Sequence, residues 1–199
     1  DILVVEMNGN SHNNVKDKIE KLSNKMKKLN LTYAITKIFD PIQQSKVWAM
    51  RQAGLGLMMN IPGDAKPIPF VEDTAVSPEK LPEYVKRFDE IVRANGTEAG
   101  YYGHAAEGCL HIRPTINLKN NEGIERMIKI SDEISDLVKE FDGSLSGEHG
   151  DGIVRGAWSE KMYGPKIIDS FRELKSAFDP ESIMNPGKIF DTPKMGENL

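Results

Sequence analysis

Apolar and polar positions follow two different periods along this chain, and each period predicts its own type of element. Amphipathic helices are predicted where apolar residues are spaced by three and four, at residues 15–29, 40–54, 82–92 and 124–141. Strands are predicted where β-branched and aromatic residues gather, at residues 2–5, 32–39, 68–76, 101–104 and 109–118. Beyond residue 144 a glycine-rich loop is followed by short predicted helices around Trp158 and at residues 167–178.

The order of these elements predicts an α+β fold. Strands separated by helices, with one direct hairpin, favour a ferredoxin-like antiparallel sheet that carries its helices on one face. We expect residues 1–143 to form this substrate domain. Residues 144–199 are expected to add the glycine-rich loop and a helical C-terminal subdomain.

Composition narrows the class of protein. The net charge is −4, from 26 basic and 30 acidic residues in 199, so nothing favours a nucleic-acid partner. No apolar run approaches the roughly 18 residues of a membrane span, and we expect a cytoplasmic location. The single cysteine, Cys109, excludes an internal disulfide and is interpreted as a small buried residue. Because the chain starts within a predicted strand, we expect it to be part of a longer protein.

Three of the four histidines fall in two short segments, at residues 103–111 and 146–152. If residues 105–108 form a hairpin loop, His104 lies opposite Cys109, and His111 lies diagonally from His104 on the same face. Diagonal neighbours are roughly 7–8 Å apart, near enough for two imidazoles to meet one ion. Two histidines and a carboxylate are a recurrent metal set, and Glu148 is the expected third ligand.

Each segment has a plainer interpretation. His104 and His111 could be ordinary strand residues satisfied by the backbone. The glycines on both sides of Glu148 and His149 suit a backbone that approaches a ligand or another domain, but they also suit a flexible loop.

Three basic residues are candidate anion ligands. Arg51, in a predicted helix, and Lys66, after a Pro-Gly loop, could each bind a carboxylate, although either could also be a solvated surface charge. Strand alternation puts Arg113 on the same face as His111, which suits an anionic substrate. The competing interpretation is an ion pair of Arg113 with Glu107 or Glu148.

Three motifs carry a resemblance to a known family. Residues 103–111 contain Gly-His-x-x-x-Gly-Cys-Leu-His, residues 147–150 are Gly-Glu-His-Gly, and residues 179–188 contain Asp-Pro-x-x-x-Met-Asn-Pro-Gly-Lys. Their order resembles the C-terminal domain of FAD-linked oxidases and dehydrogenases. That group includes D-lactate dehydrogenase, D-2-hydroxyglutarate dehydrogenase and the flavin subunit of glycolate oxidase. The likeness extends over nearly the whole chain.

The chain departs from the usual family pattern at two positions. Cys109 replaces an asparagine, and Arg113 stands where a shorter polar residue is common. Gly-Cys-Leu-His-Ile-Arg-Pro resembles a subgroup in which an iron–sulfur domain follows this one. The resemblance therefore implies a parent protein with an upstream flavin domain, this domain, and a downstream iron–sulfur domain.

The resemblance also implies roles for individual residues. It implies that a divalent ion, zinc or manganese, is held by His104, His111 and Glu148. His149 becomes the candidate base for the substrate hydroxyl. Arg51 and Lys66 are implied to bind the substrate carboxylates. The resemblance implies no definite role for Arg113, because this residue departs from the family pattern. Asn185 is expected to contact the flavin.

The function implied is half of an oxidoreductase. A D-2-hydroxy acid would pass a hydride to FAD, which the missing domain would mainly hold, and this chain alone is expected to be inactive. Three cationic side chains favour a dicarboxylate such as 2-hydroxyglutarate. The alternatives are a non-catalytic ferredoxin-like metal-binding or assembly module and, less favoured, a metal-dependent hydrolase. The ferredoxin-like fold does not separate these functions.

Overall fold

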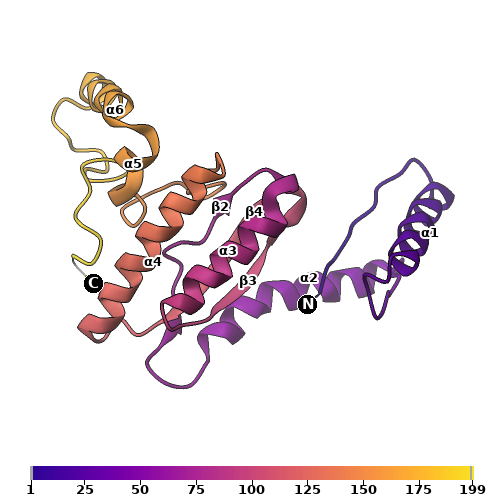
Figure 1. Cartoon of the computed structure of the whole chain (residues 1–199). Helices are drawn as coiled ribbons and strands as arrows, with labels where there is room; N and C mark the ends of the chain where they lie inside the picture. Colours follow the sequence, from indigo (N-terminus) through magenta and orange to yellow (C-terminus); the bar gives the residue numbers. More distant parts are fainter. Residues whose placement is uncertain (1, 198) are drawn as a thin grey trace. The chain divides into compact units, whose positions relative to one another are not determined.

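The computed structural model describes residues 2–197 and 199. Its chain divides into two units, Asp1–Leu55 and Gly56–Leu199, which are described separately below. Figure 1 shows the order of the elements along the sequence. The predicted domain division at residue 144 stays a prediction.

Two helices are the regular elements that begin in the described residues of the first unit, and the second of them ends beyond its last residue, Leu55. Helix α1 spans His12–Lys28 as its apolar spacing predicts, and Ser11 caps it by accepting a hydrogen bond from the Asn14 N–H. Helix α2 spans Pro41–Met59, five residues longer than predicted, and its first N–H groups donate to the carboxylate of Asp40.

The predictions of strands at residues 2–5 and 32–39 are wrong, because neither segment forms a ladder with another described part of the chain. A strand needs a partner for its backbone groups, and β-forming side chains cannot replace that partner. The side chains of Ile2 and Tyr33 are exposed.

The second unit is built around strand β4, Cys109–Ile116. Along one edge it pairs antiparallel with β3, Ala99–His104. Along the other edge it pairs at its two ends with β1, Lys66–Pro67, and β2, Thr74–Ala75. Beyond β2, Ser144 forms an isolated bridge with Ala75, which takes the place of a further strand.

The predicted continuous strand at residues 68–76 is therefore interrupted. Ile68 and Asp73 still donate their N–H groups to carbonyls of β4, but the residues between them leave the ladder. Pro69 has no N–H to donate, and Asp73 adopts the left-handed conformation with φ 74°, which breaks strand geometry. Because of this interruption, the side chains of Glu72 and Asp73 do not point to alternate faces as they would in a regular strand.

Two helices cover one face of this sheet (Figure 1). The short 3-10 turn η1, Pro78–Lys80, leads into α3, Leu81–Ala94, and β4 leads into α4, Asn121–Glu140. Their buried side chains pack on the even-numbered residues of β4, such as Ile112 and Ile116. The α+β prediction with helices on one face is confirmed, and the odd-numbered residues of β4 are left to face the other side.

The last part of the chain packs on α4. The turn η3, Gly156–Trp158, and helix α5, Ser159–Tyr163, precede α6, Pro165–Phe178. The Trp158 indole N–H donates to Ser131, and the Lys161 amine lies 2.7 Å from Asp132, so both residues attach this part to α4. Among the described helices, none is long and apolar enough to cross a membrane.

Candidate functional site

The β3–β4 hairpin brings two histidines together as the sequence predicts. His104 is paired with Cys109, and Tyr102 is paired with His111. The chain reverses through the 3-10 turn η2, Ala105–Glu107, and through Gly108 at φ 68°. A Cβ on Gly108 would lie 1.8 Å from the Val76 carbonyl oxygen, so only glycine fits there. The rings of His104 and His111 are consequently 5.7 Å apart, centre to centre.

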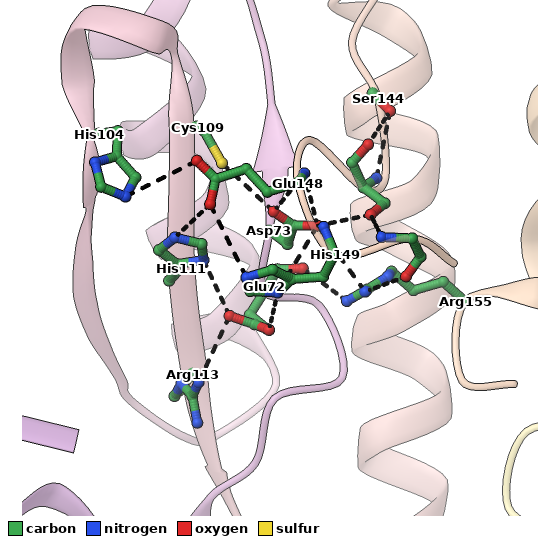
Figure 2. Close-up of polar contacts among 12 residues, drawn as sticks. Glu72, Asp73, His104, Cys109, His111, Arg113, Ser144, Glu148, His149 and Arg155 are labelled. Atoms are coloured by element: carbon green, nitrogen blue, oxygen red, sulfur yellow. Dashed lines mark hydrogen bonds and ion pairs between the residues drawn. The ribbon is translucent and has the colours of Figure 1, made fainter. Parts of the chain in front are cut away.

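The loop that carries Glu148 and His149 is fixed by Asp73. This carboxylate is fully buried and accepts hydrogen bonds from the Ser146 hydroxyl at 2.6 Å and from the N–H groups of Glu148 and His149 at 3.0 and 2.8 Å. The Asp73 carbonyl also accepts from the Gly147 N–H at 2.7 Å. An apparently flexible glycine-rich loop is therefore tied to the end of the interrupted strand (Figure 2).

The same contacts determine the ionisation of Asp73. Burial opposes the charged form, but the hydrogen bonds from Ser146 and the two backbone N–H groups outweigh it and hold the pKa below its ordinary value. Arg155 adds a cation whose Nη2 lies 4.0 Å from the carboxylate. The guanidinium of Arg155 also donates to the carbonyls of Glu72 and Gly150, so it joins the strand to the loop a second time.

Glu148 lies between three imidazoles (Figure 2). One carboxylate oxygen is 3.9 Å from His104 Nε2, and the other is 3.6 Å from His111 Nε2 and 3.9 Å from His149 Nε2. The His111 side chain is only 4% exposed, whereas those of Glu148 and His149 are 43% and 45% exposed. The cluster is therefore buried at His111 and open to solvent at Glu148 and His149.

The donor atoms of His104, His111 and Glu148 fit a divalent ion. They all lie within 4.8 Å of one another. Ligands bound tetrahedrally at zinc–nitrogen and zinc–oxygen distances are about 3.4 Å apart, so small side-chain adjustments would close the set. Two imidazoles and a carboxylate also leave coordination positions for a substrate. Donor atoms of Glu72, His111 and His149 also lie within 4.8 Å of one another, so the cluster offers more than one ligand set.

Glu72 underlies the two central histidines. Its side chain is 7% exposed, and its two oxygens lie 3.1 Å from His111 Nδ1 and 2.9 Å from His149 Nδ1. The rings of His111 and His149 are stacked 5.1 Å apart with 10° between their planes. One buried carboxylate thus contacts both imidazoles on the side opposite to Glu148.

Arg113 lies on the predicted face beside His111, but its ion-pair partner differs from those expected. Its Nη2 is 3.6 Å from Glu72 and donates to the Tyr102 hydroxyl at 3.2 Å. The partner is thus Glu72 and neither Glu107 nor Glu148. The Nε of Arg113 is buried and makes no hydrogen bond with the described residues.

Cys109 is buried, as predicted for a small apolar residue, and lies beside the site. Burial, together with its hydrogen bond to Asp73, raises the pKa of the thiol to about 12. The neutral thiol is a weak nucleophile and a poor metal ligand. This makes Cys109 a packing residue at neutral pH.

The three other predicted site residues lie in segments other than the hairpin and the glycine-rich loop. Lys66 pairs with Ile116 at the far end of β4, and its amine donates to the carbonyls of Met59 and Ile61. Arg51 lies in α2 within the first unit. Asn185 lies in the segment after α6 and adopts φ 47°. The roles assigned to these three residues stay predictions.

Sequence patterns missed three residues of the cluster, Glu72, Asp73 and Arg155. In a regular strand, Glu72 and Asp73 would point to opposite faces, and the positive φ of Asp73 is not visible in a periodicity. The available signal was two adjacent acids inside an otherwise apolar predicted strand, a position where charges need partners. Arg155 gave no such signal.

Comparisons with known proteins show the family of this chain. Residues 2–189 match the family described as FAD linked oxidases, C-terminal domain. The chain is 42% identical over 144 residues to D-2-hydroxyglutarate dehydrogenase of Haemophilus influenzae, covering 72% of this chain and 14% of that protein. With the enzyme of the same name from Escherichia coli it shares 39% identity over 155 residues, 75% of this chain and 15% of that protein. With glycolate oxidase subunit GlcD of Bacillus subtilis it shares 34% over 125 residues, 63% of this chain and 27% of that protein.

Proposed function

Since the chain belongs to the C-terminal domain family of FAD-linked oxidases, we propose that it supplies the substrate-binding half of a D-2-hydroxy-acid dehydrogenase. The observation that carries the proposal is the convergence of His104, His111, Glu148 and His149 on one open-sided cluster. The chain spans about one seventh of the length of the first relatives named above. The activity proposed therefore belongs to the whole protein, and this chain alone is expected to be inactive.

The reaction requires two transfers from the substrate. The hydroxyl loses a proton, and the carbon that bears it loses a hydride, so that the 2-hydroxy acid becomes a 2-oxo acid and two electrons leave it. The family implies FAD, which would be held mainly outside this chain. When bound, FAD would accept the hydride. We assign the proton to Nε2 of His149, whose side chain is 45% exposed on the open side.

His104, His111 and Glu148 would hold a divalent ion, zinc or manganese, because their donor atoms form one compact set. Such an ion would lower the pKa of a hydroxyl group bound to it. The residues themselves orient the substrate. His111 and Glu148 lie next to His149, so a hydroxyl held at this set would be within reach of the His149 imidazole.

A dicarboxylate of the 2-hydroxyglutarate type is the proposed substrate. Arg113 supplies a buried cation two positions along β4 from His111, on the same face. The names of the relatives with about 40% identity, D-2-hydroxyglutarate dehydrogenase, support this choice. Arg51 and Lys66 are proposed to bind carboxylates in the assembled protein, and Asn185 to contact FAD. A cytoplasmic location and a downstream iron–sulfur domain belong to the same proposal.

The test is anaerobic mixing of D-2-hydroxyglutarate with the protein that contains this chain and its flavin domain. Loss of the oxidised flavin absorbance, with 2-oxoglutarate as the product, is the expected result. Elemental analysis of that protein should find about one zinc or manganese per chain. A protein that binds metal but whose flavin is reduced by no D-2-hydroxy acid would instead be the non-catalytic metal-binding module.

A further inference from the structure

Glu72 contacts two imidazoles of the described cluster, each through its Nδ1 atom. Its Oε2 lies 3.1 Å from His111 Nδ1, and its Oε1 lies 2.9 Å from His149 Nδ1. Glu72 is nearly completely buried, and the two rings that it contacts are stacked on each other. The interaction is therefore a fixed bridge rather than a surface contact.

The chemistry of the bridge determines the tautomer of both rings. An ionised carboxylate only accepts hydrogen bonds, so each facing Nδ1 must carry a hydrogen. In a neutral imidazole the lone pair then lies on Nε2. Both Nε2 atoms, at 3.6 and 3.9 Å, face the same oxygen of Glu148 on the opposite side of the rings. The bridge thus aims two lone pairs at the place where the ion and the hydroxyl are proposed to bind.

Other groups hold Glu72 in this orientation. Arg113 Nη2 lies 3.6 Å from Oε2. Arg155 Nη1 donates to the Glu72 carbonyl oxygen at 3.0 Å. The left-handed Asp73 that follows turns the backbone so that Glu72 leaves the ladder of β4. Glu72 is therefore restrained through both its side chain and its main chain.

We infer that Glu72 is a positioning residue that fixes His111 as a metal ligand and His149 as a proton acceptor at the same time. The inference rests on the proposed function and deepens it. Carboxylates that accept from the second nitrogen of a metal-bound histidine orient the ring and increase its affinity for the metal. Here one carboxylate serves two histidines, so metal binding and proton removal depend on the same side chain.

Glutamine at position 72 separates this role from simple packing. Its amide oxygen can accept from one Nδ1, but its NH₂ group presents a donor to the other. One imidazole must then place its lone pair at Nδ1 and its hydrogen at Nε2, which removes a lone pair from the site. Glu107→Gln is the matched control, because Glu107 is an exposed carboxylate on the same hairpin.

The experiment uses the 199-residue chain with ¹⁵N-labelled histidine and records long-range ¹H–¹⁵N correlations, which distinguish the two tautomers. In the unaltered chain at a pH where the rings are neutral, we expect Nδ1–H for His111 and His149. In Glu72→Gln at least one of them should change to Nε2–H. Affinity for Co²⁺, followed by its visible absorption, should fall about 10- to 100-fold. Both properties should be unchanged in Glu107→Gln.

Two results would overturn the inference. One is an Nε2–H tautomer for His111 or His149 in the unaltered chain, a measurement that needs no variant to fold. The other is ¹⁵N coupling of bound ¹¹³Cd²⁺ to Nδ1 of these histidines, which would make Glu72 a ligand in its own right. Neither result depends on flavin reduction, so either can be told apart from a failure of the proposed reaction.

Discussion

The buried carboxylate of Asp73 accepts a hydrogen bond of 2.8 Å from the backbone N–H of His149, 76 residues further along the chain. This contact places the proposed base next to Glu72 and joins the interrupted strand to the glycine-rich loop. Because Asp73 also accepts from Glu148 and Ser146, a single side chain fixes the loop that carries both functional residues.

Asp73→Asn should destabilise the fold and loosen the loop. The amide would turn a donor toward N–H groups that now meet only acceptors, and a hydrogen bond to a charged group contributes roughly 1.5–3 kcal/mol. We expect the free energy of unfolding in urea to fall by about 3 kcal/mol. Asp64→Asn, at an exposed carboxylate paired with Lys119, should have little effect and is the control. Equal stability of the two variants would contradict the role of Asp73.

The same carboxylate predicts a dependence of stability on pH. Its pKa in the folded chain is lower than the ordinary value of 3.8, so its ionised form is favoured by folding. The stabilisation is therefore complete above pH 3.8 and is lost as the pH falls through the folded pKa. The difference in unfolding free energy between the unaltered chain and Asp73→Asn should shrink from pH 7 to pH 3. A constant difference across that range would exclude ionisation of Asp73 as its source.

Cys109 should resist thiol reagents in the folded chain. Its pKa of about 12 leaves almost no thiolate at pH 8, and the side chain is buried. Reaction with Ellman's reagent should be slow in buffer and fast in urea, with one thiol released because the chain has one cysteine. Rapid modification of the folded chain would show that Cys109 is more accessible than its burial indicates.

Arg113→Met should discriminate between two classes of substrate. If Arg113 binds the second carboxylate, its loss should weaken the binding of D-2-hydroxyglutarate by roughly 2–5 kcal/mol. The KM for this substrate should rise accordingly. The KM for the monoacid D-lactate should change much less. The monoacid is the necessary control, because Arg113 also pairs with Glu72 and the variant could disturb the site in general. Equal effects on both substrates would make Arg113 a structural residue.

Sequence alone predicts the helices and the hairpin well because both are local. The four residues from Ala105 to Gly108 fix the register of β3 on β4, and that register fixes the approach of His104 to His111. Residues 2–5 and 32–39 fail as strands because a strand depends on a partner that its own side chains do not specify.

The support of the site could not be predicted because it depends on one irregular residue. A positive φ at Asp73 turns two acids out of a predicted strand and into a cluster with residues over 70 positions away. The pattern of apolar residues does not indicate such a backbone conformation. The motif at residues 147–150 located the histidine and the glutamate, but not the carboxylates that hold them.

The central claim is that Glu148 and His149, adjacent in sequence, have separate roles in oxidation of a 2-hydroxy acid. The most direct measurement is the rate of flavin reduction by D-2-hydroxyglutarate in a single anaerobic turnover of the protein that contains the flavin domain. His149→Asn should retain its metal and its substrate affinity but slow flavin reduction by about 10²- to 10⁴-fold, the usual contribution of a positioned base. Glu148→Gln should lose metal and recover part of its rate when metal is added. Flavin reduction at the normal rate in His149→Asn would contradict the account, and so would loss of metal from that variant with full retention in Glu148→Gln.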